Sequence, residues 1–181
     1  MQISAVPKEI SEWSGSVLIA GILEGTIESQ INLFKAIIKD TFLSQRFIDS
    51  KFEGKKNQKL SIELIEGKVK KVIFVGLGKA ETLRIDDLRK AASIGTRQVS
   101  GYERKLGIFF PWDAFDPSSA ACAVGEAVRL SSIKDLRFKS ESKDNTPIDE
   151  VELIGLDPKI TKSAIAEINP ICEGVKFARE L

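Results

Sequence analysis

The stretch KKVIFVGLGKAETLRIDDLRKAA, residues 70–92, decides the fold class of this chain. Residues 72–75 are apolar without interruption, which is typical of a strand buried on both faces of a sheet. Residues 85–99 then repeat apolar side chains at three- and four-residue spacing, with Asp86 and Asp87 in the first turn. This pattern predicts an amphipathic helix whose positive end is stabilised by acidic side chains. A buried strand followed at once by a helix is the building unit of an α/β protein.

The corner between that strand and that helix contains Gly76 and Gly78, so two phosphate-binding templates have to be considered. A P-loop requires Ser or Thr after its Gly-Lys pair, but this chain has Ala80 there. A dinucleotide fingerprint requires a third glycine where this chain has Glu81. Because neither template fits, we interpret the glycines as a tight turn that lets a helix pack on the strand, with no nucleotide required.

The remaining segments continue the alternation of strands and helices. We expect strands at 16–25, 60–67, 67–78, 105–112 and 150–157, helices at 28–39, 85–99, 117–130 and from 160 onward, and loops at 44–60 and 136–149. Asp116 followed by Pro117 fits an N-cap and a first helical position, and Asn169-Pro170 is expected to start a fresh helix. This order predicts an α/β fold with a mainly parallel sheet.

The charges of the chain nearly cancel, with 27 Lys and Arg, 26 Asp and Glu, and a net charge of +1. Such a balance argues against nucleic acid or an anionic membrane as the partner. The chain has no histidine, which excludes histidine-based triads and the usual zinc sites. Its two cysteines, Cys122 and Cys172, are interpreted as buried thiols of an intracellular protein. The apolar run at 17–23 is too short to cross a membrane, and we expect a cytoplasmic location.

Two groups of charged residues are candidates for chemistry. Lysines around Gly54 could contact phosphates. Such charge runs are usually solvated, and we favour that interpretation. The group comprises Lys51, Lys55, Lys56 and Lys59, with Lys68, Lys70 and Lys71 a strand away. Among the carboxylates, Asp113, Asp116 and Glu126 could meet near a strand end, although capping alone accounts for Asp116. The other acidic candidates show no spacing typical of metal ligands, and these are Asp86, Asp87, Asp144, Asp149 and Glu150.

The remaining candidates are better explained by packing. Ser118 and Ser119 have no base nearby in the sequence that could activate them. The aromatic side chains at 109–112 are predicted to belong to the core and the strand edge. We therefore identify no catalytic, cofactor-binding or metal-ligating residue in this chain.

Residues 70–92 resemble the strand-turn-helix signature of the N-terminal domain of leucyl aminopeptidases, the cytosol aminopeptidase family of two-metal peptidases. GEAVRLSSIKDLRFKS at 125–140 is similar to a later helix and exit loop of that family, IDEVELIGLD at 148–157 to its last strand, and ICEGVKFAREL at 171–181 to its linker helix. Each motif is weak by itself, but their order and spacing extend over nearly the whole chain.

This resemblance implies a macro-domain-like fold, a mixed and mainly parallel sheet flanked by helices. It implies that residues 1–165 form a non-catalytic N-terminal domain and that residues 166–181 begin a linker helix to a catalytic domain. The parent would remove N-terminal residues from peptides, leucine preferred, with two divalent ions (manganese or zinc) and as a homo-hexamer. Because no position here matches the family's metal-binding or catalytic residues, we expect no cofactor in this part and a role in hexamer assembly and active-site access.

Two other functions stay open at this point. A macro-like fold can be a binding module for a nucleotide or a nucleic acid, held at the carboxyl ends of the strands. A stand-alone enzyme is the third hypothesis, and the lack of histidine and of any ligand cluster weighs against it. We also expect the end of the last helix, residues 173–181, to fray or to pair with a second copy, because one of its faces lacks a cover.

Overall fold

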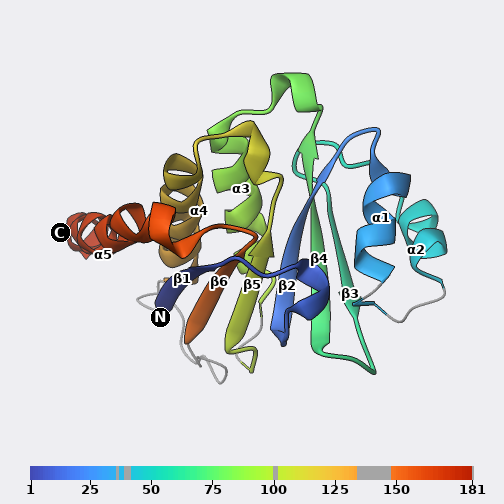
Figure 1. Cartoon of the computed structure of the whole chain (residues 1–181), viewed down its shortest axis with the longest axis horizontal. Coiled ribbons are helices and arrows are strands. Elements are labelled where there is room, and N and C mark those ends of the chain that lie inside the picture. Colours follow the sequence, from blue (N-terminus) through green and yellow to red (C-terminus); the bar gives the residue numbers. More distant parts are fainter. Residues whose placement is uncertain (36, 39–41, 100–101, 134–147, 181) are drawn as a thin grey trace.

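One sheet organises the protein (Figure 1). The computed structural model describes residues 1–35, 37–38, 42–99, 102–133 and 148–180. Within these ranges six strands lie in the order β1-β6-β5-β2-β4-β3. The strands are β1 (Gln2–Val6), β2 (Gly15–Leu23), β3 (Lys59–Glu63), β4 (Val69–Gly78), β5 (Lys105–Phe109) and β6 (Glu150–Ile154). All neighbours are parallel except β3, which runs antiparallel to β4 at one edge. The expected mixed, mainly parallel sheet is confirmed.

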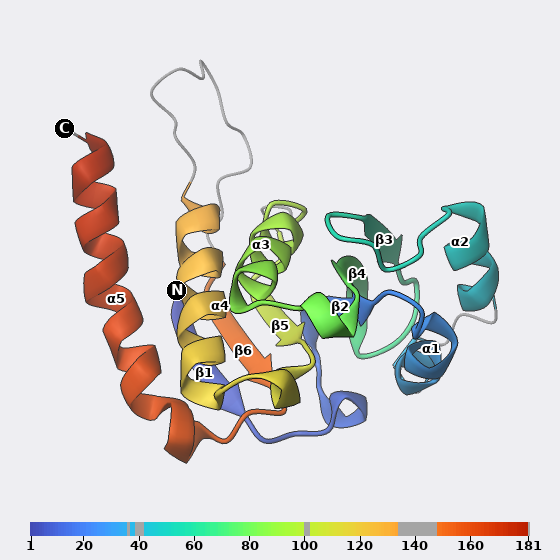
Figure 2. The same ribbon diagram turned by 90° about the horizontal axis from the view of Figure 1, so that it is seen from above.

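Helices cover both faces of this sheet, as the α/β pattern predicts. They are α1 (Ile27–Lys35), α2 (Leu43–Asp49), α3 (Ile85–Thr96), α4 (Pro117–Ser132) and α5 (Pro158–Glu180), with short 3-10 turns η1 (Ile10–Glu12), η2 (Ala80–Thr82) and η3 (Trp112–Ala114). Figure 2 shows α3, α4 and α5 side by side, with α1 and α2 at the other end of the sheet. None of the helices in the described part of the chain is long and apolar enough to span a lipid bilayer.

Alternate residues of β4 point into two separate cores, because successive side chains of a strand face opposite ways. Ile73 and Val75 belong to the core under α3 and α4, whereas Phe74 belongs to the core under α1 and α2. The second core is aromatic: the ring of Phe74 lies 5.1 Å from that of Phe34 and 4.9 Å from that of Phe47. The uninterrupted apolar run at 72–75 is therefore explained by burial on both faces.

Strand β1 is an element to which the sequence analysis assigned no structure. It pairs in parallel with β6 at the edge opposite β3, and the Gln2 amide donates to the Asp149 carbonyl at 2.7 Å. Ala5 is buried, whereas Gln2 is exposed. A strand of five residues at a sheet edge carries too few buried positions for a clear pattern.

Helix α2 corrects the expectation of a loop at 44–60. Leu43 and Phe47, one helical turn apart, are both buried, while polar residues such as Gln45 face solvent. A seven-residue helix is too short to be stable alone, so the packing of its two apolar side chains stabilises it. The expected loop at 136–149 lies outside the described residues, apart from its last two positions.

Helix α5 runs without a break from Pro158 to Glu180, so the expectation of a fresh helix at Asn169-Pro170 is wrong. Pro170 lies inside the helix and cannot donate to the carbonyl of Ala166. Both residues are exposed, so water can bind that carbonyl, while Ile168 on the inner face is buried beside Gly125 of α4. The division of the chain at residue 166 falls within this helix and stays a prediction.

The outer end of α5 yields a first testable prediction. Gly174 has open space where a side chain would begin, and the side chain of Phe177 is 66% exposed. We expect the amides of 173–180 to exchange with solvent at least about tenfold faster than those of 72–75, because few contacts oppose local opening there. Hydrogen exchange read by mass spectrometry, on a sample shown to be monomeric, measures this. Equal protection of the two segments in a monomer would contradict the expected fraying.

Candidate functional site

The carboxyl edge of the parallel strands is the first place to look for a ligand site. In open α/β sheets, ligands bind outside the carboxyl ends of the strands, where the chain connections change direction. Here that edge carries the ends of β2, β4, β5 and β6 and includes the turn at Gly76–Gly78. A nucleotide bound in the usual way would need space and donors at this edge.

Backbone of the loop before β3 fills that space above β4. The Gly76 amide donates to the Gln58 carbonyl and the Gly78 amide to the Gly54 carbonyl, both at 2.8 Å. A Cβ on Gly76 would lie 2.0 Å from the carbonyl oxygen of Lys55, which no side chain tolerates. The glycine turn is thus structural, as expected, but it makes room for this loop rather than for a helix.

The N-termini of three helices point to the same edge, and each is closed by a carboxylate from the chain itself. Asp87 accepts from the Arg84 amide at 2.9 Å, Asp116 from the Ser119 amide at 2.8 Å, and Asp157 from the Lys159 amide at 2.7 Å. Such N-termini bind phosphates when their amides are free. An incoming phosphate would here meet carboxylates, which speaks against a nucleotide at this edge.

The pKa values of two caps follow from these contacts. Burial by itself raises the pKa of Asp87, but hydrogen bonds from Lys56 and from the Arg84 amide, with the charge of Lys56, hold it below its ordinary value. For Asp116, the hydrogen bond from the Ser119 amide is the largest cause and lowers the pKa. Both caps therefore stay ionised well into the acidic range. The expected N-cap role of Asp116 is confirmed.

Three lysines of the basic group are engaged within the fold. Lys56 pairs with Asp87 at 2.8 Å, and Lys55 pairs with Glu53. Lys71, buried in β4, donates to the Gln98 carbonyl at 3.0 Å just beyond the end of α3, where a cation suits the helix dipole. The others are exposed, namely Lys51, Lys59, Lys68 and Lys70. This pattern supports the structural interpretation of the lysines over a phosphate-binding patch.

The carboxylates Asp113, Asp116 and Glu126 do not form a cluster. Asp116 is committed to Ser119, and Glu126 lies nearly three turns further along α4, about 15 Å away, where it pairs with Arg89 at 3.5 Å. In the described ranges, no group of three or more His, Cys, Asp or Glu side chains is placed to hold a metal ion.

Most other acidic candidates also have basic partners. Asp86 pairs with Arg89, Asp149 with Arg104 at 3.2 Å, and Glu150 with Lys105 at 3.4 Å, while Asp144 lies outside the described residues.

The cysteines and the serine pair are held within the fold. Cys172 is buried, as expected, whereas Cys122 is only half-buried, and both are free thiols. Burial raises the pKa of Cys122 to about 11, with further contributions from Glu126, and burial likewise raises the pKa of Cys172. Both are therefore protonated and weak nucleophiles at neutral pH.

Ser118 donates to the Ile160 carbonyl at 3.0 Å, and Ser119 donates to Asp116. Phe110 and Trp112 are buried, as predicted.

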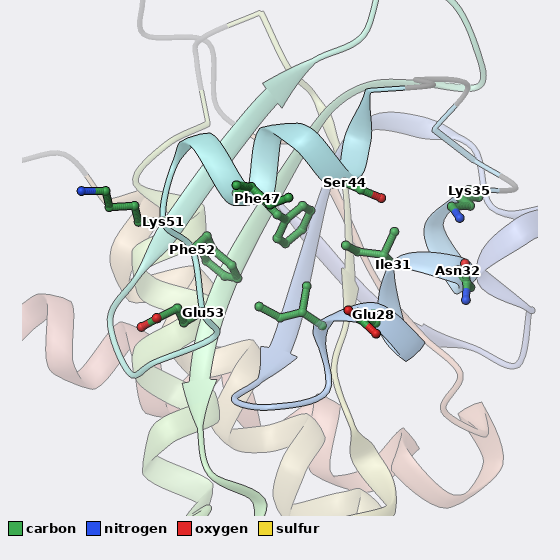
Figure 3. A pocket seen from close by; sticks show the side chains of 11 residues that line it. Glu28, Ile31, Asn32, Lys35, Ser44, Phe47, Lys51, Phe52 and Glu53 are labelled. Carbon is green, nitrogen blue, oxygen red and sulfur yellow. The ribbon is translucent and has the colours of Figure 1, made fainter.

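A groove between α1 and α2 is a hollow that the sequence analysis missed (Figure 3). Its volume is about 710 Å³, and its walls include Ile31 from α1, Phe47 from α2 and Phe52 just after α2. The groove went unnoticed because α2 was expected to be a loop. The available signal was the spacing of Leu43 and Phe47, which places both on one face of a helix.

Comparison with known proteins then assigns the family. A model described as "Cytosol aminopeptidase family, N-terminal domain" matches residues 21–142, which is more than half of the chain. The chain belongs to the cytosol aminopeptidase family.

Relatives and solved structures agree with this assignment. The chain is 46% identical over 181 residues to a probable cytosol aminopeptidase of Prochlorococcus marinus (strain MIT 9211), and 34% identical over 184 residues to one of Synechococcus sp. (strain CC9311). In both comparisons all of this chain matches 36% of the relative, so it spans about a third of their length. A mutant of tomato leucine aminopeptidase has the same fold, with a TM-score of 0.77, 21% identity, and coverage of 99% of this chain and 38% of that chain.

The second prediction concerns the turn of this aminopeptidase-family domain. Gly76→Ala should lower the free energy of unfolding by about 3 kcal/mol, because the new methyl group overlaps the Lys55 carbonyl and the loop has to move. Gly174→Ala is the matched control, since nothing lies within 4 Å of its added Cβ and alanine favours helix. Urea unfolding of both variants measures the difference. Equal stabilities would refute a crowded turn.

The third prediction concerns pH. Asp87→Asn keeps an acceptor for the Arg84 amide but loses the charge opposite Lys56, and should cost about 1 kcal/mol at neutral pH. Because the pKa of Asp87 is lowered in the folded state, its contribution exists above its unfolded-state pKa and disappears as pH falls through the folded value. The difference in stability between the two proteins should therefore shrink as pH falls below the ordinary pKa of an aspartate. Asp86→Asn, at an exposed position, is the control. A constant difference down to pH 2 would contradict this account.

Proposed function

We propose that this chain is the non-catalytic N-terminal domain of a metal-dependent leucyl aminopeptidase, and that it serves assembly of a homo-hexamer and access to the active sites. The observation that carries the proposal is the match of the entire chain to about a third of each cytosol aminopeptidase relative. The other two thirds of such a protein would bind two divalent ions, manganese or zinc, and hydrolyse the first peptide bond of a substrate in the cytoplasm.

The described residues of this chain do not fit a role in holding those ions. The described ranges contain no cluster of carboxylate, thiol or imidazole side chains placed for a metal. The carboxylates at the carboxyl edge of the sheet instead cap helices. No step of peptide hydrolysis is therefore assigned to this domain, and the absence of catalytic, cofactor-binding and metal residues stays a prediction. No observation favours a nucleotide or nucleic acid as the alternative ligand.

The outer face of α5 suits contact with the rest of such an enzyme. Ile160, Ile171 and Phe177 are 56%, 43% and 66% exposed, which is unusual for large apolar side chains of one helix. The opposite face of the same helix is occupied, since Ile168 and Cys172 are buried. A helix held to the domain on one side can present the other side to a catalytic domain or to a second subunit.

The fourth prediction tests catalysis directly. The isolated chain should not hydrolyse leucine p-nitroanilide in the presence of manganese or zinc, because its described residues contain no donor set for either ion. The control is a chimera that joins this chain to the remaining part of the MIT 9211 relative, which should be active. Metal-dependent turnover that co-purifies with the isolated chain would overturn the proposal.

The same chimera tests the assembly role. Phe177→Asp should leave the melting temperature of the isolated chain unchanged, since the side chain is exposed there. In the chimera it should reduce both the oligomer and the activity at least about tenfold, as expected when an apolar anchor is lost from an interface. Lys176→Asp, at the neighbouring exposed position, serves as the control. A fully assembled and active Phe177→Asp chimera would contradict a role for this face.

A further inference from the structure

The groove between α1 and α2 has the shape and lining of a binding site. Its volume of about 710 Å³ lies within the usual range for ligand pockets. The floor is apolar: Phe47 and Phe52 pack edge to face with ring centres 5.4 Å apart, and Ile31 forms the opposite wall. It lies on the α1 side of the sheet, away from the carboxylate caps of α3, α4 and α5.

Charged side chains of both signs stand on the rim of this groove. Glu28 and Lys35 lie on the same side of α1, about 10 Å apart along its axis. Lys51 lies two residues after the end of α2. Within the described part of the chain, none of the three forms an ion pair, in contrast to Glu53 on the same rim, which pairs with Lys55. Figure 3 shows Lys51 and Glu28 on opposite sides of the Phe47 and Phe52 rings.

Lys51 occupies a backbone position that favours glycine. The Phe52 amide donates to the Phe47 carbonyl at 3.1 Å and the Lys51 amide to the Ile48 carbonyl at 3.0 Å. These two bonds define a Schellman motif, in which the residue at the position of Lys51 is left-handed and is usually glycine. Lys51 has a φ of 52°, so the chain places a β-carbon where it is disfavoured. A lysine retained there at a cost in stability points to a use for its side chain.

We propose that this groove binds a short apolar peptide with free termini, whose carboxylate pairs with Lys51 and whose ammonium group pairs with Glu28. The side chains of the peptide would pack mainly on Ile48, which lines the groove and is 67% exposed, because Ile31, Phe47 and Phe52 are at most 5% exposed. In Figure 3 the side chain of Lys51 points away from the other labelled side chains, and its flexible four-carbon stem would let it turn toward the groove.

This inference does not depend on the proposed function, because it concerns the isolated chain alone. Titration calorimetry with the tripeptide Phe-Ala-Leu should show saturable binding in the submillimolar range. The C-terminal amide of the peptide should bind at least about tenfold more weakly, as should the N-acetylated peptide, since each loses one charge pair. No saturation up to about 5 mM, or equal binding of the capped peptides, overturns the proposal.

Two substitutions of Lys51 separate its backbone from its side chain. Lys51→Gly should raise the melting temperature by about 2–4 °C while weakening Phe-Ala-Leu at least about tenfold. Stability is measured at 0.5 M salt, which screens the attraction of the lysine to the carboxyl end of α2. Binding is measured at low salt. Lys51→Arg should keep the affinity, and Lys68→Ala, an exposed lysine outside the groove, should change neither property.

The remaining variant addresses the other terminus of the peptide. Glu28→Gln should weaken the free peptide but leave the N-acetylated peptide unchanged, because the latter has no ammonium group. A melting temperature that falls in Lys51→Gly would overturn the argument from backbone strain. Unchanged affinity in that variant would overturn the pairing of the carboxylate with Lys51.

Discussion

The carbonyl oxygen of Lys55 lies where a side chain at position 76 would begin, and much of the structure follows from that contact. Because Gly76 has no Cβ, the loop at 54–58 can lie directly on the end of β4 and exchange two backbone hydrogen bonds with it. The same loop carries Lys56 to Asp87, which caps α3, and leads into β3, the antiparallel edge strand. One missing side chain thus joins a loop, two strands and a helix. The loop covers the end of β4, at the edge where α/β proteins usually hold ligands.

The fold class could be predicted from the sequence because residues 72–75 are apolar on both faces and residues 85–99 repeat with helical spacing. Elements that depend on contacts between distant parts of the chain could not be predicted in this way. Helix α2 is stable only because Phe47 packs on Phe74, some distance away in the chain, and its own sequence is mostly polar. Pro170 suggested the start of a new helix. A proline is tolerated inside α5 because it faces solvent, and the sequence alone does not show which residues of the helix face solvent.

In the candidate sites too, features that depend on neighbouring residues could be predicted, whereas features that depend on distant contacts could not. The failure of both phosphate templates at Gly76 and Gly78 was visible in the sequence, and so was the capping role of Asp116, whose partner is three residues away. The role of Asp87 as the partner of Lys56 was not, because thirty-one positions separate them. The groove was also hidden, since its walls come from two helices, and the left-handed conformation of Lys51 has no signature in the local sequence.

The carboxylate caps of α3, α4 and α5 have a consequence for the evolution of this scaffold. Parallel strands bring the N-termini of these helices to one edge, where their dipoles add to a positive potential. Asp87, Asp116 and Asp157 cancel it locally. At the N-cap positions of Asp116 and Asp157, serine or asparagine caps a helix about as well as aspartate but adds no charge. A domain of this topology could therefore change from repelling anions toward attracting them through substitution of Asp116 and Asp157 alone, with its core and its strand order left intact.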